Sequence, residues 1–126
     1  MGAFSPDGKW MAYWTDEPGH PEIFVASFPD GAVRRRVSTD IGQYPQWSKD
    51  GRVLYYVNGK RQLTALPFST TGTTFELGQP KRLGEVPGTG IGPPFSLTAD
   101  GRILAVFEPS ATQPRPIIVV LNAATT

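Results

Sequence analysis

Residues 43–57 read Gln-Tyr-Pro-Gln-Trp-Ser-Lys-Asp-Gly-Arg-Val-Leu-Tyr-Tyr-Val, and versions of this stretch stand on both sides of it. Upstream, residues 4–13 read Phe-Ser-Pro-Asp-Gly-Lys-Trp-Met-Ala-Tyr. Downstream, residues 95–106 read Phe-Ser-Leu-Thr-Ala-Asp-Gly-Arg-Ile-Leu-Ala-Val. Each copy has an apolar residue, a turn that ends in Asp-Gly, one basic residue and a run of apolar or aromatic residues. The chain therefore contains an internal repeat.

Each copy predicts a β-hairpin followed by a buried strand. In the turn at residues 5–8, Ser-Pro-Asp-Gly, serine suits the first position, proline sets φ at the second, and glycine supplies the left-handed residue. The strand that follows, such as 53–57, is apolar at every position, so both of its faces must be covered. A stack of small sheets covers both faces, as in the blades of a β-propeller.

The spacing of the repeats is that of propeller blades. The Asp-Gly pairs begin at positions 7, 50 and 100, which lie 43 and 50 residues apart, and four short strands with their turns fill such a period. We therefore expect an all-β chain made of blades of four antiparallel strands. Residues 1–126 would form a single partial propeller of about two and three-quarter blades, with blade 1 at about 3–38, blade 2 at about 46–86 and blade 3 at about 95–121, which lacks its outer strand.

The expected strands follow from the apolar runs and the turn residues between them. They are 3–5, 9–15, 22–28 and 33–38 in blade 1, 46–48, 52–57, 62–68 and 81–86 in blade 2, and 95–97, 102–107 and 117–121 in blade 3. Asn58-Gly59 predicts a two-residue hairpin turn. A polar loop rich in threonine is expected between residues 68 and 81, and the three arginines at 34–36 are expected on a solvated outer strand.

An incomplete ring leaves an unpaired strand edge and two blade faces without neighbours. We expect these to be covered by self-association or by further sequence. Two chains would supply about five to six blades and three chains about eight, both within the range of propellers. The expected partners are therefore copies of the same chain, as a dimer or trimer, with a protein or peptide as a further partner.

Composition excludes several other functions. The formal charge of +1 offers no electrostatic reason to expect nucleic acid or an anionic membrane as a partner. Because the chain has no cysteine, disulfides, thiolate metal sites and a cysteine nucleophile are excluded, and the redox compartment stays open. The chain begins directly with the first repeat, so no signal peptide is expected, and the apolar run 117–121 is too short to span a bilayer. The localisation is unknown.

The motifs do not predict a catalytic centre, a cofactor or a metal. The lone histidine, His20, stands without a Gly-x-Ser-x-Gly nucleophile motif, and we expect a surface histidine. Asp7, Asp50 and Asp100 each occupy a position where a turn favours aspartate. The glycine-rich stretch 88–92 is followed by two prolines, so no helix N-terminus is expected there to bind a phosphate.

Six of the aromatic residues are expected to pack between blades, because they lie in the first two strands of the predicted blades. These are Trp10, Tyr13, Trp14, Trp47, Tyr55 and Tyr56. Ligand binding is expected instead in the loops that open on the channel face of a propeller. The candidate ligand-binding residues are Asp16, Glu17, His20, Asp40, Gln43, Tyr44, Lys60 and Arg61. Loops of mixed charge with an aromatic residue suit recognition of a protein or peptide.

The motifs resemble the WD40-like (TolB-like, PD40) propeller repeats of bacterial proteins, whose signature Phe-Ser-Pro-Asp-Gly-Lys stands at residues 4–9. Residues 45–51, residues 75–80 with Leu83, and residues 118–122 look like the C-terminal propeller of certain bacterial serine/threonine protein kinases. The resemblance covers residues 4–122. It implies a non-catalytic module that senses a ligand or binds protein.

Two alternative hypotheses involve an enzyme. In the first, the chain is the accessory propeller of a serine peptidase of the prolyl oligopeptidase type, because similar propellers control substrate access there while a separate domain carries the catalytic triad. In the second, the chain is a hydrolase whose site forms only when chains assemble, with His20 as its first candidate residue.

Overall fold

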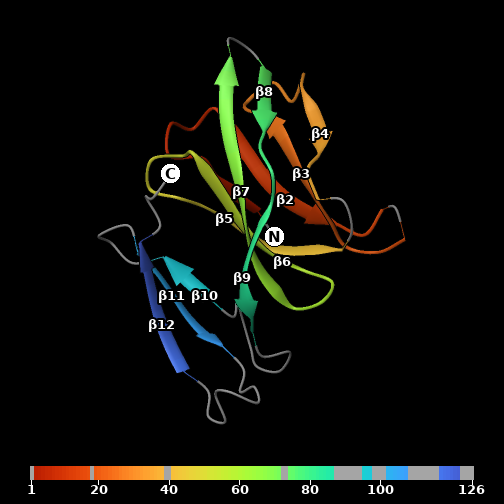
Figure 1. Cartoon of the computed structure of the whole chain (residues 1–126). Coiled ribbons are helices and arrows are strands. Elements are labelled where there is room, and N and C mark those ends of the chain that lie inside the picture. The colour runs from red at the N-terminus through yellow and green to blue at the C-terminus, as the bar shows by residue number, and fades with distance from the viewer. Residues whose placement is uncertain are drawn as a thin grey trace.

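A computed structural model of the chain describes residues 2–17, 19–38, 41–71, 74–86, 95–97, 102–107 and 117–122. Across these residues every regular element is a β-strand, and they contain no helix (Figure 1). The strands form three antiparallel sheets that follow one another along the chain. The predicted all-β fold class is confirmed.

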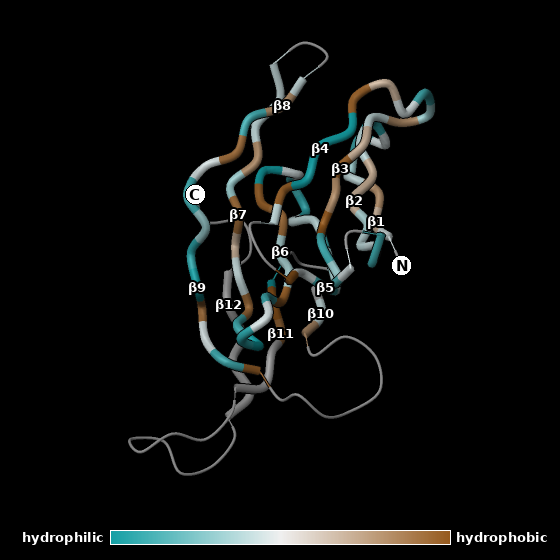
Figure 2. Tube along the Cα trace, turned by 90° about the vertical axis from the view of Figure 1, so that its right-hand side faces the viewer, coloured by the Kyte–Doolittle hydropathy of each residue, from teal (hydrophilic) through white to brown (hydrophobic). Residues whose placement is uncertain are grey.

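The first sheet has four strands in sequence order, β1 (Gly2–Phe4), β2 (Trp10–Thr15), β3 (Glu22–Ser27) and β4 (Arg34–Arg36). The predicted strands of blade 1 overlap all four. Strand β4 ends the sheet, and its three arginines are exposed, as predicted for a solvated outer strand. Figure 2 shows this strand as hydrophilic.

The second sheet contains β5 (Gly42–Trp47), β6 (Val53–Asn58) and β7 (Gln62–Thr71), in that order. Two strands pair with different halves of the long strand β7: β8 (Thr74–Leu77) with its second half and β9 (Lys81–Glu85) with its first. The third sheet contains β10 (Phe95–Leu97), β11 (Arg102–Phe107) and β12 (Ile117–Asn122). The predicted strands of blade 3 coincide with these to within one residue.

Strand β6 explains the packing of the three sheets, because its side chains alternate between two cores. Leu54 and Tyr56 belong to the core shared with the first sheet, whereas Val53, Tyr55 and Val57 belong to the core shared with the third sheet. All five are buried. The sequence prediction that this strand is covered on both faces is confirmed, and the second sheet lies between the other two.

The predicted polar loop after residue 68 is wrong in part. Instead, β7 continues to Thr71 and pairs with β8 as a projecting hairpin. The physical reason is Phe75, which is 1% exposed and packs into the core between the first two sheets. The β-branched Thr70, Thr71 and Thr74 suit the extended backbone of the two strands.

The predicted two-residue turn at Asn58-Gly59 is also wrong. Strand β6 ends at Asn58 and β7 begins at Gln62, so the loop has three residues. The Asn58 side chain accepts hydrogen bonds from the backbone N–H groups of Lys60 and Gln62 at 3.0 and 2.9 Å. These bonds stabilise a longer turn in which Arg61, and not Gly59, has the left-handed backbone.

The aspartates of the repeat act within their own turns, as predicted. Asp7 Oδ1 accepts hydrogen bonds from the Ser5 hydroxyl at 2.6 Å and from the Lys9 backbone N–H at 3.0 Å. Asp50 accepts the equivalent pair of bonds at 2.7 and 3.0 Å. Asp100 lies outside the described residues.

We expect Asp7→Asn to reduce the sensitivity of the fold to acid. The hydrogen bonds from Ser5 and Lys9 hold the pKa of Asp7 below its ordinary value of 3.8. A lowered pKa stabilises the fold above the unfolded value, and this contribution disappears as the pH falls through the folded value. Melting temperatures measured from about pH 6 to about pH 2 should therefore fall less in the variant. Parallel curves for the two proteins would contradict this account of the turn.

Candidate functional site

Three connections of the first two sheets meet at one end of the molecule. Thr15 pairs with Glu22 at the mouth of the β2–β3 loop, and Gly42 pairs with Asn58 beside the β6–β7 turn. The Gly42 N–H donates a hydrogen bond to the Pro21 carbonyl at 2.9 Å, which ties the two parts together. We call this region, residues 16, 17, 19–21, 41–44 and 58–61, the loop end.

Seven of the eight candidate ligand-binding residues lie at the loop end: Asp16, Glu17, His20, Gln43, Tyr44, Lys60 and Arg61. The eighth, Asp40, lies outside the described residues. Glu17 forms an ion pair with Arg34 at 3.5 Å, and both side chains are largely exposed. His20 turns instead toward a buried carboxylate.

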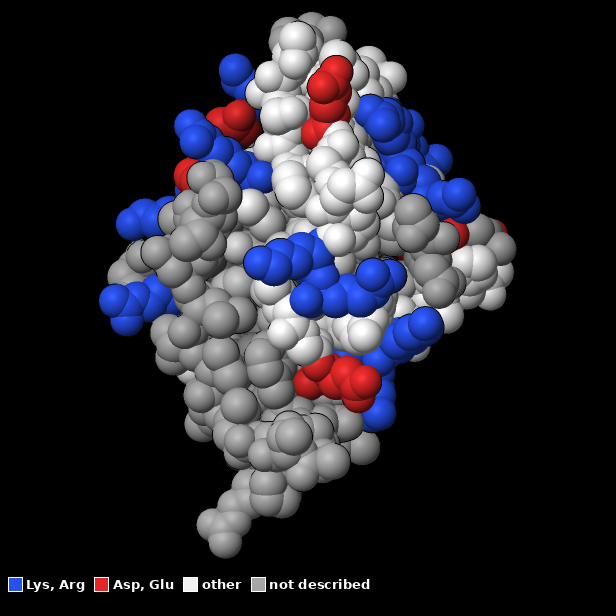
Figure 3. Space-filling view, viewed as in Figure 1, with Lys and Arg blue, Asp and Glu red and all other residues white. Residues whose placement is uncertain are grey.

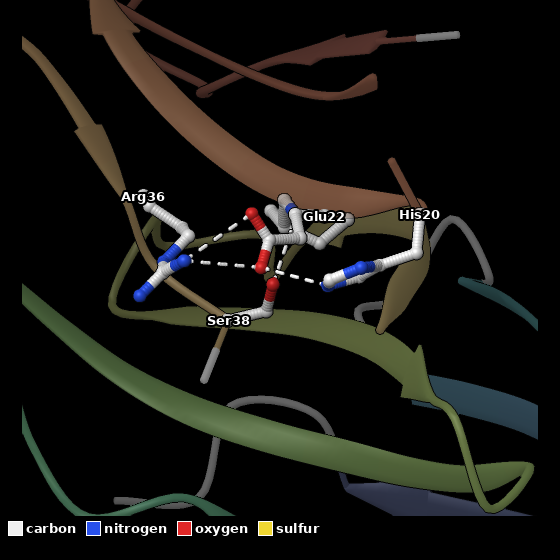
Figure 4. A network of polar contacts seen from close by, with 5 residues as sticks. His20, Glu22, Arg36 and Ser38 are labelled. Carbon is white, nitrogen blue, oxygen red and sulfur yellow. Dashed lines mark hydrogen bonds and ion pairs between the residues drawn. The ribbon is translucent and has the colours of Figure 1, made fainter. Parts of the chain in front are cut away.

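That carboxylate belongs to Glu22, which is 2% exposed and stands at the start of β3. His20 Nε2 lies 3.1 Å from its Oε1, and Arg36 Nη1 donates to the two carboxylate oxygens at 3.1 and 3.5 Å (Figure 4). Beside them, Ser38 Oγ accepts a hydrogen bond from the Ile23 N–H at 2.9 Å. Because a buried charge is costly without a partner, the two half-exposed basic side chains explain how Glu22 is accommodated.

The cluster lacks the contacts of a catalytic triad. A nucleophile and its base must lie within hydrogen-bonding distance, yet within the described part of the chain no serine or threonine hydroxyl bonds to His20. Over the same residues, no group of acidic and histidine side chains is arranged to hold a metal ion. None of the described elements is a helix that would be long and apolar enough to cross a membrane.

Two non-glycine residues of the described chain have a left-handed backbone, and both lie at the loop end. Tyr44 has φ of 59° within a register shift of the β5–β6 pairing, and Arg61 has φ of 60° in the β6–β7 turn. In the repeat turns, the left-handed residues are the glycines Gly8 and Gly51. Strained backbone of this kind concentrates at functional sites.

One indole nitrogen near this end has no hydrogen-bond partner among the described residues. It is Nε1 of Trp14, whose side chain packs partly buried against the core of the first two sheets. Trp14 pairs with Ile23, one position from the β2–β3 loop. An unpaired buried donor of this kind costs about 1–3 kcal/mol.

A hollow of about 550 Å³ lies at the opposite end, beside the Asp-Gly turns of the first two sheets. Trp10 and Phe68 line it together with Asp7 and Asp50. Both carboxylates already accept two hydrogen bonds within their turns. We therefore interpret these two aspartates as structural residues of the repeat turns and not as ligand-binding residues of the hollow.

Sequence reasoning missed Glu22 and Arg36. Glu22 precedes an apolar run in its strand, and the sequence predicts Arg36 on a solvated outer strand. A signal was present: a single carboxylate in a buried strand requires a basic partner, and the adjacent strand is entirely arginine. The pairing of Phe24 with Arg36 sets Arg36 diagonally across from Glu22 on the same face of the sheet.

A comparison with solved structures identifies a protein of similar fold. A solved structure described as a "putative 6-phosphogluconolactonase" from Bacteroides uniformis matches with a TM-score of 0.53 and 19% sequence identity. The match covers 98% of this chain and 41% of the other. The fold is that of a β-propeller segment. The segment spans about two-fifths of the length of that propeller, and at this identity the likeness concerns architecture alone. No protein-family model matches the sequence, and no curated protein does.

Proposed function

We propose that the chain is a non-enzymatic β-propeller module, completed by further copies of itself, that binds a protein or peptide at the loop end. The main support for a binding site at the loop end is the backbone conformation of Tyr44 and Arg61. Both were candidate residues on sequence grounds, and both have a left-handed backbone. The mixed charges of Glu17, Lys60 and Arg61 at the loop end suit a polar protein surface.

The repeat chemistry supports a propeller of the WD40-like, TolB-like kind. The signature serine and aspartate of residues 4–9 form the hydrogen bonds that close the first turn. In the second sheet, Ser48 and Asp50 form the same bonds. By the resemblance to the C-terminal propellers of bacterial serine/threonine kinases, we propose a sensing or protein-binding role.

The outward face of the first sheet supports the proposed assembly. Phe4 and Phe28 are 55% and 47% exposed, and their rings meet edge to face with centroids 4.9 Å apart. On the same face, Tyr13 stacks on Phe24 at 5.9 Å. Leu104, on the third sheet, is also exposed. In the assembly, the third sheet of one copy would pack against the first sheet of the next and cover these side chains. Within one chain, the second sheet packs against the first and third sheets in the same way.

We expect Arg61→Gly to stabilise the fold and to weaken binding. Glycine adopts the left-handed backbone without strain, so the free energy of unfolding should rise by about 1 kcal/mol. The same change removes a guanidinium from the proposed binding surface. Peptides selected from a displayed library by the unaltered protein should bind the variant at least about tenfold more weakly, a loss of about 1.4 kcal/mol.

Gly8→Ala is the matched control at the opposite end. Gly8 has φ of 72°, and an added Cβ would meet no atom within 4 Å, so the change tests backbone strain alone. It should lower the free energy of unfolding by about 1 kcal/mol and leave peptide binding unchanged. A library that yields no selective peptide, or equal effects of both variants on binding, would contradict the proposed site.

A further inference from the structure

A small cavity of about 180 Å³ is lined by Ser38 of the polar cluster and by residues of the second sheet. One wall is a row of side chains across three neighbouring strands, because Thr64 of β7 pairs with both Tyr56 of β6 and Arg82 of β9. Side chains opposite one another in paired strands lie close together on the same face. Ser38 and Ile41, from the connection between the sheets, line the other side.

The charge of the cavity has one sign. Lys60 and Arg82 both line it, and the described lining residues include no aspartate or glutamate. Neither basic side chain forms an ion pair with a carboxylate of the described chain. Basic side chains also gather over β9 in the middle of the face drawn in Figure 3. Two exposed basic groups therefore stand at the rim of a hollow that carries no described counter-charge.

Three of the residues that line the cavity carry hydroxyl groups and are almost fully buried. Ser38 and Thr64 are each 2% exposed and Tyr56 is 4% exposed. Burial raises the pKa of Tyr56, and the nearby charge of Arg82 acts in the opposite direction. The phenol is therefore neutral at physiological pH and can donate a hydrogen bond. Ser38 Oγ already accepts a hydrogen bond from Ile23, so its own proton is free to be donated.

The size of the cavity limits what it can hold. Pockets for drug-sized ligands measure about 300–1,000 Å³, whereas this one holds about 180 Å³. A phosphate group carries between one and two negative charges near neutral pH and several acceptor oxygens. It therefore matches two cations and several hydroxyl donors better than a carboxylate, which carries one charge.

We propose that this cavity binds a phosphate group, with Lys60 and Arg82 pairing its charge and the hydroxyls of Tyr56 and Ser38 donating to its oxygens. The inference rests on the proposed function, because Lys60 belongs to the loop end. It deepens that function by naming the chemistry of one ligand group. The group comes either from free phosphate or from a phosphorylated side chain of a bound protein.

The test is a titration of the full chain with sodium phosphate at constant ionic strength, followed through amide chemical shifts in two-dimensional NMR. We expect saturable shifts at the cavity residues with a millimolar dissociation constant, and weaker binding of acetate. O-phosphoserine serves as the second probe. Tighter binding of O-phosphoserine than of phosphate would indicate a phosphorylated partner, and equal binding would indicate the free ion.

The variants Arg82→Gln and Lys60→Gln should each weaken phosphate binding at least about tenfold, because each removes a charge-assisted hydrogen bond. Tyr56→Phe should weaken it about threefold. Lys49→Gln removes the same charge from an exposed turn at the opposite end and should change nothing. If Arg82→Gln unfolds the sheet, Lys60→Gln still tests the proposal, because Lys60 is exposed in the turn and its replacement should leave the fold intact.

Two results would overturn the proposal. Non-saturating shifts, or equal weakening by Lys49→Gln and Lys60→Gln, would mean that phosphate associates by charge alone. Either result leaves the peptide experiment on Arg61→Gly intact, so failure of the phosphate site and failure of the proposed function are distinguishable.

Discussion

Replacing Phe75 with alanine is expected to lower the free energy of unfolding by about 3–5 kcal/mol, the usual cost of removing a buried phenyl ring. The ring of Phe75 stacks on Phe68 with centroids 4.9 Å apart and meets Trp10 edge to face at 5.1 Å. Arg35 lies over the same ring at 4.7 Å and donates a hydrogen bond to the Phe75 carbonyl at 2.8 Å. The side chain and carbonyl of Phe75 thus connect the hairpin of β7 and β8 to the first sheet.

Thr74→Ala is the control for this substitution, because Thr74 is the exposed neighbour of Phe75 in the same strand. Its effect should stay within about 0.5 kcal/mol. Denaturant unfolding monitored by tryptophan fluorescence measures both variants. A loss of less than about 1 kcal/mol for Phe75→Ala would mean that the hairpin contributes little to the packing of the first sheet on the second.

Replacing Phe28 with aspartate is expected to dissociate the proposed assembly. In the assembly, the outward face of the first sheet is covered, so the new carboxylate would be buried without a partner. We expect the dissociation constant to rise at least about 100-fold, which corresponds to about 2.7 kcal/mol. Because Phe28 is 47% exposed in the single chain, the fold of each copy should persist.

Lys49→Asp is the control for the assembly. It also introduces a carboxylate, but at an exposed turn of the second sheet, whose two faces are already covered. Sedimentation velocity measures the two variants side by side. Equal dissociation by Lys49→Asp would attribute the effect to charge and not to the face that carries Phe28.

The sequence predicted the strands well because each depends on local chemistry. Uninterrupted apolar residues at 53–57 require two covered faces, and the structure places them alternately in two cores. The prediction of a polar loop after residue 68 failed because a distant contact decides the backbone there. The threonine-rich segment pairs as a hairpin because Phe75 reaches a core formed largely by other strands, and that contact is invisible in the local sequence.

The end of the molecule at which the candidate residues lie could be predicted, but their contacts could not. Tyr44 lies in the first half of β5 and Arg61 in the β6–β7 turn, so their place at one end follows from the order of the strands. The role of Tyr56 could not be predicted, since an aromatic residue in an apolar strand is ordinarily a packing residue. Tyr56 lines the small cavity of the second sheet, where Thr64 and Arg82 fall in register beside it.

The most direct test of the account is the absolute mass of the 126-residue chain in solution, measured by light scattering on a size-exclusion column across a dilution series. We predict a discrete dimer or trimer, with two or three times the mass of one chain, that resists dilution and is lost in Phe28→Asp. A folded monomer at every concentration would contradict the proposal that copies of the chain complete the propeller.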